Sequence, residues 1–389
     1  MKRWIWDKDR PLLINVASMI LKLMVFIMLF YKFIANDIPI VAKSGGQWSF
    51  PVCQEYVFDM GISGYDPKMQ QKSYDFGIYP IIKHSPSQTD LDNILANPGT
   101  ESFILGSDKL GRDVLSGLIY GTSTAVKVSL VAVLLSLIIA IFIGVISGYY
   151  NKRPIRLNTL QLILGVVLLL LNTCYFISEI FSYDFNLILV LIPMVISFII
   201  WYFINPMLSK MKIKKWNIAI HQVTDRIIEV REAIPIIFLI LAAVALFRNN
   251  SIWNVALVIG LIGWGGLSRY IRAEVMKVRE KAYVDAAIIQ GQSTSRIIWR
   301  HVLPNALDPL LSIITFSFTA AVLFEATLSF LGIGMPPDQP TWGLLLAQAR
   351  SGNAWWLAIF PGLCIFIAIA SLNTVADYIQ QRLDSRIRQ

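Results

Sequence analysis

Apolar runs long enough to cross a lipid bilayer dominate this sequence of 389 residues. A spanning helix needs about 20 mostly apolar residues, because the hydrocarbon layer is about 30 Å thick and a helix rises about 1.5 Å per residue. Two runs, 233–247 and 252–267, are somewhat short for this. Because only 15% of all residues are charged, the pattern favours an integral membrane protein over a large soluble enzyme. The strong candidates are 12–34, 126–149, 160–177, 187–204, 310–331 and 356–376.

The first run is expected to remain in the protein as an anchor helix. It is too long for the apolar core of a cleavable signal peptide, and no small-x-small cleavage site follows it. Lys22 lies near its middle, where a charge is costly in lipid. We expect this side chain to pair with another group, to extend toward the interface or to line a pathway.

The distribution of positive charge predicts the orientation. If the N-terminus is cytoplasmic and all eight runs cross, 23 of the 34 Lys and Arg residues fall on the cytoplasmic side. The short outer segments 178–186 and 332–355 together hold one. This asymmetry follows the positive-inside rule and also predicts a cytoplasmic C-terminus. The net charge of +9 therefore requires no nucleic-acid partner, and none is expected.

The same asymmetry constrains the two short runs. A crossing by only one of them would place basic segments on both sides of the membrane. Both runs therefore cross, or both form a re-entrant hairpin. The resulting division of the chain is 1–34 with the first helix, an extracytoplasmic loop 35–125, a second helix 126–150, a segment 151–221 with two further spans, and 222–389, which includes a cytoplasmic loop 268–309.

A stretch of the outer loop follows the spacing of a phosphate-binding loop but lacks its chemistry. It begins at Gly106 and continues through Asp108 and Gly111. Arg112 occupies the position of the phosphate-binding Lys, and Asp113 occupies the position of the Mg²⁺-binding hydroxyl. We expect a helix start here instead, with Ser107 or Asp108 as the N-cap. No spacing in the sequence indicates a metal site or a catalytic residue, so no cofactor is expected in this chain.

The cytoplasmic loop 268–309 carries the most informative pattern. Ala286 and Ala287 lie in a short apolar helical surface that Gly291 can end. Ser293 or Thr294 can then cap a second helix, and Pro304 is expected to end the segment. The result is a short helix, a glycine turn and another helix. This unit is either an amphipathic connector at the interface or a docking element for a cytoplasmic partner.

Three motifs resemble ABC importer permeases. Val284-Asp285-Ala286-Ala287, followed after three residues by Gly291 and later by Leu303-Pro304, resembles the family's E-A-A-x3-G…L-P loop. Residues 105–116 resemble the L-G-T-D-x-L-G-R-D-V-L-S signature of the dipeptide/oligopeptide and nickel branch, in its C-type subunit. Residues 328–343 are similar to that branch's L-S-F-L-G-x-G…P-P…S-W-G run. The resemblance covers about 105–150 and 222–380, with the motifs in the family's order.

The resemblance implies an all-α membrane fold, the six-helix core of a type I ABC importer permease with one inserted transmembrane hairpin. It implies a permease in the bacterial inner membrane that imports di- or oligopeptides. Its expected partners are a second permease subunit, two cytoplasmic ATPase subunits that bind ATP and Mg²⁺, an extracytoplasmic substrate-binding protein and membrane lipid. The residues expected to couple it to the ATPases are Tyr283, Asp285, Ala286, Ala287, Gly291, Leu303 and Pro304.

The sequence departs from the family pattern at several places. Asp285 replaces the usual Glu, which keeps the charge but shortens the side chain by one methylene. The two spans within 151–221 have no counterpart, and Arg231-Glu232 places charges where the family is usually apolar. Glu325, an acid within a span, either packs structurally or lines the pathway.

Two other classes of membrane protein remain as alternatives. An ion-coupled secondary transporter needs acidic residues at mid-membrane and internal repeats, for which only Glu325 is a candidate. An intramembrane enzyme needs a paired set of catalytic side chains within the spans, and none is present.

Overall fold

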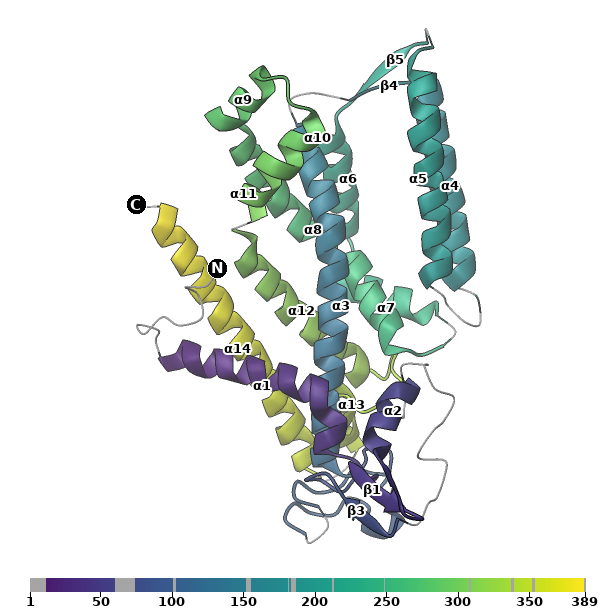
Figure 1. Ribbon diagram of the computed structural model, residues 1–389, viewed down its shortest axis with the longest axis vertical. Coiled ribbons are helices and arrows are strands. Elements are labelled where there is room, and N and C mark those ends of the chain that lie inside the picture. The colour runs from purple at the N-terminus through teal and green to yellow at the C-terminus, as the bar shows by residue number, and fades with distance from the viewer. Residues whose placement is uncertain are drawn as a thin grey trace. The chain divides into compact units, whose positions relative to one another are not determined.

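The computed structural model describes residues 12–59, 74–100, 103–151, 155–180, 182, 187–211, 213–247, 249–307, 309–336, 339–351 and 354–387 (Figure 1). The contacts divide the chain into two compact units. One comprises Met1–Val131 with Thr315–Gln389, and the other comprises Ala132–Ile314.

The first unit combines long apolar helices with a small sheet. Helix α1 packs along α14, and α13 also packs against α14. The sheet has the order β2-β1-β3 with antiparallel neighbours, and β1 pairs Lys43 with Trp48 and with Phe76. Its elements are α1 (Leu12–Ile34), β1 (Val41–Ser44), β2 (Gln47–Ser49), α2 (Pro51–Asp59), β3 (Phe76–Ile78), η2 (Leu91–Asn93), the first part of α3 (Val114–Tyr149), most of α12 (Leu310–Phe330), α13 (Trp342–Gln348), η4 (Ala349–Ser351) and α14 (Trp356–Ile387).

The second unit is built on α8 and the remainder of α3. Its buried core includes Ala140, Ile271, Val275 and Leu303. Its further elements are β4 (Ile155–Asn158), α4 (Thr159–Ile180), α5 (Leu187–Ser209), β5 (Lys215–Ile218), α6 (Ile220–Glu232), α7 (Ile236–Ala245), α8 (Ile252–Arg279), α9 (Ala282–Ile289), α10 (Thr294–Ile297), the π-turn η3 (Ile298–Val302) and α11 (Leu303–Leu307).

Seven helices of the described chain are long and apolar enough to cross a membrane, which confirms the helical membrane fold. The eighth expected span, 233–247, forms the ten-residue helix α7, about 15 Å long at 1.5 Å per residue. This is about half the thickness of the hydrocarbon layer. The number of crossings and the sides of the termini therefore stay predictions.

Two helices extend well beyond their apolar runs. Helix α3 begins at Val114 rather than near residue 126, and α8 continues to Arg279 rather than ending near residue 267. In α8 the apolar periodicity persists among the charges, because Ile271, Val275 and Val278 are all buried in the core of the second unit. The connection expected over 268–309 is correspondingly shorter.

Helices α3 and α8 approach each other closely where both backbones lack bulky side chains. A Cβ added at Gly144 would lie 2.8 Å from the Ile271 Cβ and 2.8 Å from the Ser268 oxygen. At Gly148 it would lie 2.9 Å from the Arg272 oxygen. Small residues allow such contact between membrane helices, where packing replaces the hydrophobic effect as the driving force.

The segment 151–221 forms a helical hairpin, as expected, and a β-ribbon closes it. Helix α4 packs on α5, and β4 pairs antiparallel with β5 from Ile155↔Ile218 onward. Polar side chains join the helices: Gln161 Nε2 donates to Asn205 Oδ1 at 2.6 Å, and Asn172 Nδ2 donates to Ser197 Oγ at 2.8 Å. Apolar side chains point outward, which is the arrangement that a lipid environment favours.

The hairpin predicts opposite locations for its two ends. Topology reporters inserted after Ser182 and after Lys215 should report opposite sides of the membrane, because α5 alone has 23 residues between them. Cysteine labelling in spheroplasts would provide the readout. Labelling of both positions from the same side would contradict a transmembrane hairpin.

The close contact at Gly144 predicts that a larger side chain there lowers the stability of the protein. Gly144→Val should lower the free energy of unfolding by about 1–3 kcal/mol, because the new side chain overlaps Ile271 and a backbone oxygen of α8. Thermal unfolding of the purified protein in detergent measures this change. The matched control is Gly266→Ala, since a Cβ there meets nothing within 4 Å. An equal loss in both variants would contradict the close contact.

Candidate functional site: the helical segment after α8

The short helix α9 ends in a glycine turn of defined geometry. Gly291 has φ +76°, a left-handed conformation that favours glycine. Gln292 N donates to Ala287 O at 3.2 Å and Gly291 N donates to Ile288 O at 3.0 Å. These two bonds form a Schellman motif, which satisfies the last carbonyls of the helix. The expected helix, glycine turn and second helix are confirmed.

The next helix starts with one of the two expected N-caps but continues past Pro304. Ser293 is the N-cap of α10, and its Oγ accepts from Arg296 N at 3.4 Å. The expectation that Pro304 ends the segment was wrong. Pro304 is the second residue of α11, which continues directly from η3, so the chain stays helical through this proline.

Helix α9 has one face in the core and one face outside it. Val284 and Ala287 are buried with α8 residues such as Val275 and Val278. Tyr283 and Ile289 are 42% and 86% exposed, although both are large and apolar. An exposed apolar surface next to a rigid core is a typical protein interaction site.

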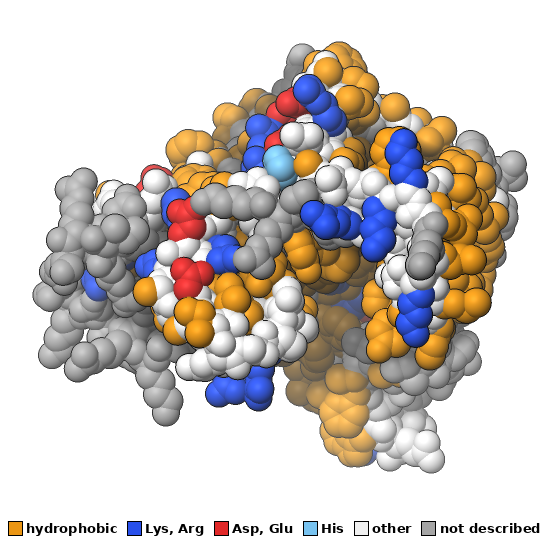
Figure 2. Space-filling model, turned by 90° about the horizontal axis from the view of Figure 1, so that it is seen from above, with side chains coloured by type: hydrophobic (Ala, Val, Ile, Leu, Met, Phe, Trp, Pro, Cys, Tyr) orange, Lys and Arg blue, Asp and Glu red, His pale blue; other side chains and the backbone are white. Residues whose placement is uncertain are grey.

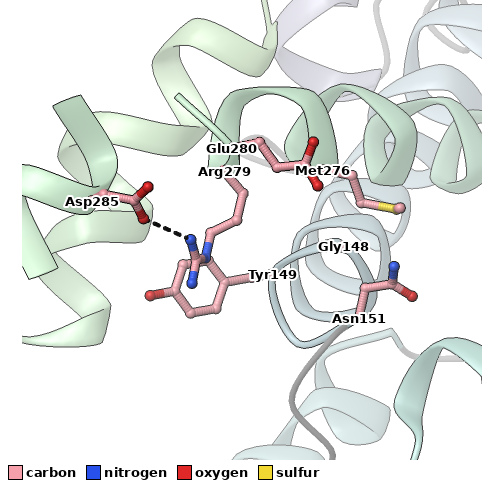
Figure 3. A pocket seen from close by; sticks show the side chains of 7 residues that line it. All are labelled: Gly148, Tyr149, Asn151, Met276, Arg279, Glu280 and Asp285. Atoms are coloured by element: carbon pink, nitrogen blue, oxygen red, sulfur yellow. Dashed lines mark hydrogen bonds and ion pairs between the residues drawn. The ribbon is translucent and has the colours of Figure 1, made fainter. Parts of the chain in front are cut away.

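A hollow of about 460 Å³ lies beside α9 and is lined by seven residues (Figure 3). Arg279 and Asp285 point toward each other across it, with Arg279 Nη1 3.4 Å from Asp285 Oδ1. The Arg279 guanidinium also lies 5.4 Å from the centre of the Tyr149 ring. Because the Asp285 side chain is 60% exposed, solvent screens this ion pair and it contributes about 0–1 kcal/mol.

The expected coupling residues therefore separate into two groups. Ala287 and Leu303 are buried and support the segment, whereas the others are exposed. Sequence reasoning missed Ile289, Trp299 and Arg279. Ile289 shares a helix face with Tyr283 and Ala286 at the spacing i, i+3 and i+6, which could have identified it. No local pattern identifies Trp299, which is 66% exposed. The exposed members of the expected set are Tyr283, Asp285, Ala286, Gly291 and Pro304.

Basic side chains are common on one face of the molecule. Figure 2 shows Lys and Arg side chains spread among apolar ones on this face, with fewer Asp and Glu. The cytoplasmic location of the segment after α8 stays a prediction from the positive-inside rule.

The charges at Arg231 and Glu232 are accommodated against α8. Arg231 Nη1 donates to Ile262 O at 3.0 Å, and a Cβ at Gly265 would lie 2.7 Å from the Arg231 guanidinium. Arg269 forms an ion pair with Glu232 and holds the pKa of that carboxyl below its usual value. Glycine at position 265 therefore provides the space that this arginine occupies.

The expected outer motif forms a compact hydrogen-bonded loop in the first unit. Asp108 is 1% exposed, and its Oδ1 accepts from Leu110 N at 2.8 Å and Arg112 N at 2.9 Å. Its Oδ2 pairs with Arg112 Nε at 2.8 Å. Gly106 and Gly111 both have positive φ. A Cβ at Gly111 would overlap the backbone of Asp90, so only glycine fits there.

The N-cap of α3 is Asp113, so the expectation of Ser107 or Asp108 was wrong. Asp113 Oδ2 accepts from Ser116 N at 2.8 Å, three residues further on. Burial raises the pKa of this carboxyl above its usual value. Ser107 instead donates from Oγ to Asn93 O, and its own carbonyl accepts from Trp356 Nε1 at 3.0 Å. The motif therefore ties the start of α3 to α14.

Glu325 lies fully buried in α12. Its Oε1 accepts from Ser329 Oγ at 2.9 Å, one helical turn further on, and its Oε2 has no partner among the described residues. The close approach of α13 surrounds this region, because a Cβ at Gly343 would lie 2.1 Å from Ala326 O. Whether Glu325 packs structurally or lines a pathway stays a prediction.

Comparison with known proteins identifies the family. The family model described as "Binding-protein-dependent transport system inner membrane component" matches residues 140–389, more than half of the chain. A putative peptide transport system permease protein of Brucella suis biovar 1 (strain 1330) is 30% identical over 311 residues, 79% of this chain and 81% of that protein. The di/tripeptide transport system permease protein DppC of Pseudomonas aeruginosa (strain UCBPP-PA14) is 27% identical over 315 residues, 79% of this chain and 82% of that protein.

Another relative comes from Alkalihalophilus pseudofirmus, whose dipeptide transport system permease protein DppC is 27% identical over 310 residues, 79% of this chain and 80% of that protein. With the apolar helices described above, these matches make the chain a multi-pass protein of the bacterial inner membrane. The chain belongs to the family of binding-protein-dependent transport system inner membrane components, the ABC importer permeases.

Proposed function

We propose that this chain is the permease subunit of an ATP-driven importer of di- or oligopeptides. The peptide substrate rests on the names of the relatives, several of which are peptide or dipeptide permeases. Family membership gives no support to the ion-coupled alternative. In this proposal the chain has no catalytic residue and no cofactor, because ATP and Mg²⁺ are bound by partner subunits.

The proposed partners are a second permease subunit, two cytoplasmic ATPase subunits and an extracytoplasmic substrate-binding protein. The observation that carries the coupling role is the exposed apolar face of α9, which includes Tyr283, Ala286 and Ile289. A groove on the ATPase would receive this face. The ATPase shifts the inward/outward equilibrium only by binding the two states with different affinity.

The buried face of α9 provides the mechanical connection in this proposal. Val284 and Ala287 belong to the same packed core as Val275 and Val278 of α8. Packed interiors transmit displacement because they are dense and have low compressibility. A movement imposed on α9 therefore moves the end of α8 with it, and α8 carries the movement into the membrane.

A single charge on the exposed face tests the docking role. Ile289→Glu should reduce retention of the ATPase in the detergent-solubilised complex by about tenfold or more, because a buried unpaired carboxylate costs several kcal/mol. Affinity purification through a tag on this chain measures the retained ATPase. Ile81→Glu is the matched control, since Ile81 is 90% exposed but lies outside the segment. Undiminished retention in Ile289→Glu would contradict docking at α9, and a wild-type complex without ATPase would contradict the importer proposal.

The glycine turn provides an independent test. Gly291→Ala should destabilise the end of α9 by about 1–2 kcal/mol, because an L-residue is strained at φ +76°. A Cβ there meets nothing within 4 Å, so crowding does not contribute. Gly291→Asn should be milder, since Asn tolerates this conformation better. Peptide-stimulated ATPase activity of the reconstituted complex should follow the order Gly, Asn, Ala, and equal activity of all three would contradict the turn's role.

A further inference from the structure

An ionic and aromatic cluster joins α1, α2 and the first part of α3 within the first unit. At its centre Lys32, only 3% exposed, pairs with Glu55 at 3.0 Å and with Asp59 at 2.5 Å. Asn36 Nδ2 donates to the second oxygen of Glu55 at 2.7 Å. The Lys32 ammonium is therefore already surrounded by acidic partners.

The aromatic part of the cluster consists of three tyrosines. Tyr31 lies 5.8 Å from Tyr56 and 4.6 Å from Tyr120 between ring centres, both in edge contacts. Burial raises the pKa of Tyr56 to about 12, so its phenol stays protonated and donates to Leu29 O at 3.0 Å. These rings form one continuous surface beside the charges of Lys32, Glu55 and Asp59.

A second lysine of the cluster lacks the partners that the first one has. Lys127 Nζ lies 4.4 Å from the centre of the Tyr31 ring, and no hydrogen bond or ion pair holds it within the described chain. The residue is half-buried and is the second residue of the apolar run 126–149, at one end of that run. Ionisable residues inside spans are costly and face partners or water-filled cavities. A ring face alone replaces only part of the lost hydration.

A neighbouring hydroxyl also lacks a partner. The Tyr120 hydroxyl is buried and has no hydrogen bond among the residues that the structure describes. Tyr120 and Lys127 are seven positions apart on α3, so they share a helix face, and both contact Tyr31. The face thus presents one ammonium and one phenol, and both groups donate hydrogen bonds.

We propose that Lys127 and Tyr120 form a binding site for the carboxylate of the transported solute. Two unpartnered donors, one of them charged, match the acceptor oxygens of a carboxylate. This inference rests on the proposed function, in which the solute is a peptide with a free C-terminus.

The test compares a dipeptide with its C-terminal amide. Uptake of both is measured in proteoliposomes that contain the complete importer with its binding protein and ATPases. The binding protein acts equally on wild type and variant, so a change in the acid-to-amide uptake ratio reports on the permease. Lys127→Gln should lower this ratio by about tenfold, because a charge-assisted hydrogen bond is lost. Lys127→Arg should largely preserve it.

Two further variants separate the site from general damage. Tyr120→Phe removes only the hydroxyl and should lower the ratio by a smaller factor than Lys127→Gln. Lys22→Gln changes an exposed lysine of α1 and should leave the ratio unchanged. Complex assembly and the thermal unfolding midpoint should be equal in all variants, which shows that the fold is retained.

The outcomes distinguish a failure of the carboxylate site from a failure of the proposed peptide import. If wild type imports the dipeptide and Lys127→Gln keeps the same acid-to-amide ratio, the carboxylate site is wrong and the peptide importer stands. If wild type imports neither peptide while its ATPase is active, the proposed function fails. If the effect of Lys127→Gln instead disappears in liposomes without anionic lipid, the lysine binds a lipid headgroup and the solute site is overturned.

Discussion

The close contact between α3 and α8 is the interaction on which the second unit depends. Gly144 and Gly148 let the two backbones approach to distances that any side chain would prevent. The core that forms around this contact continues without interruption into α9 and α11. Because membrane helices gain little from leaving lipid, such contact must supply the packing energy itself. The core against which α9 packs thus includes a contact that depends on two glycines far from α9 in the sequence.

The bilayer imposes the second constraint, and the inserted hairpin displays it clearly. Lipid cannot hydrogen-bond polar groups, so Gln161, Asn172 and Asn205 make their bonds inside the hairpin. Within the described chain, α4 and α5 make their principal contacts with each other and with β4. The hairpin is therefore complete as a helical pair. This explains how a family fold can accept it without rearranging the core helices.

The sequence predicted what depends on local pattern and missed what depends on distant contacts. Apolar runs located the spanning helices, and Gly291 located the turn after α9, because both signals are contained in a few neighbouring residues. The true start of α3 was missed although its N-cap Asp113 is a local signal, because the continuous apolar run begins only at residue 126. The pairing of Lys32 with Glu55 and Asp59 was missed because it joins separate elements.

Asp285 shows how a weak interaction can suit a docking surface. The side chain is shorter than the family's usual Glu, yet it still reaches Arg279 at 3.4 Å. Because the Asp285 side chain is 60% exposed, breaking the pair costs about 1 kcal/mol or less. The Arg279 guanidinium also lies over the Tyr149 ring, 5.4 Å from its centre. A partner can therefore take Asp285 away from Arg279 at little cost, while the end of α8 stays ordered and ready to move with α9.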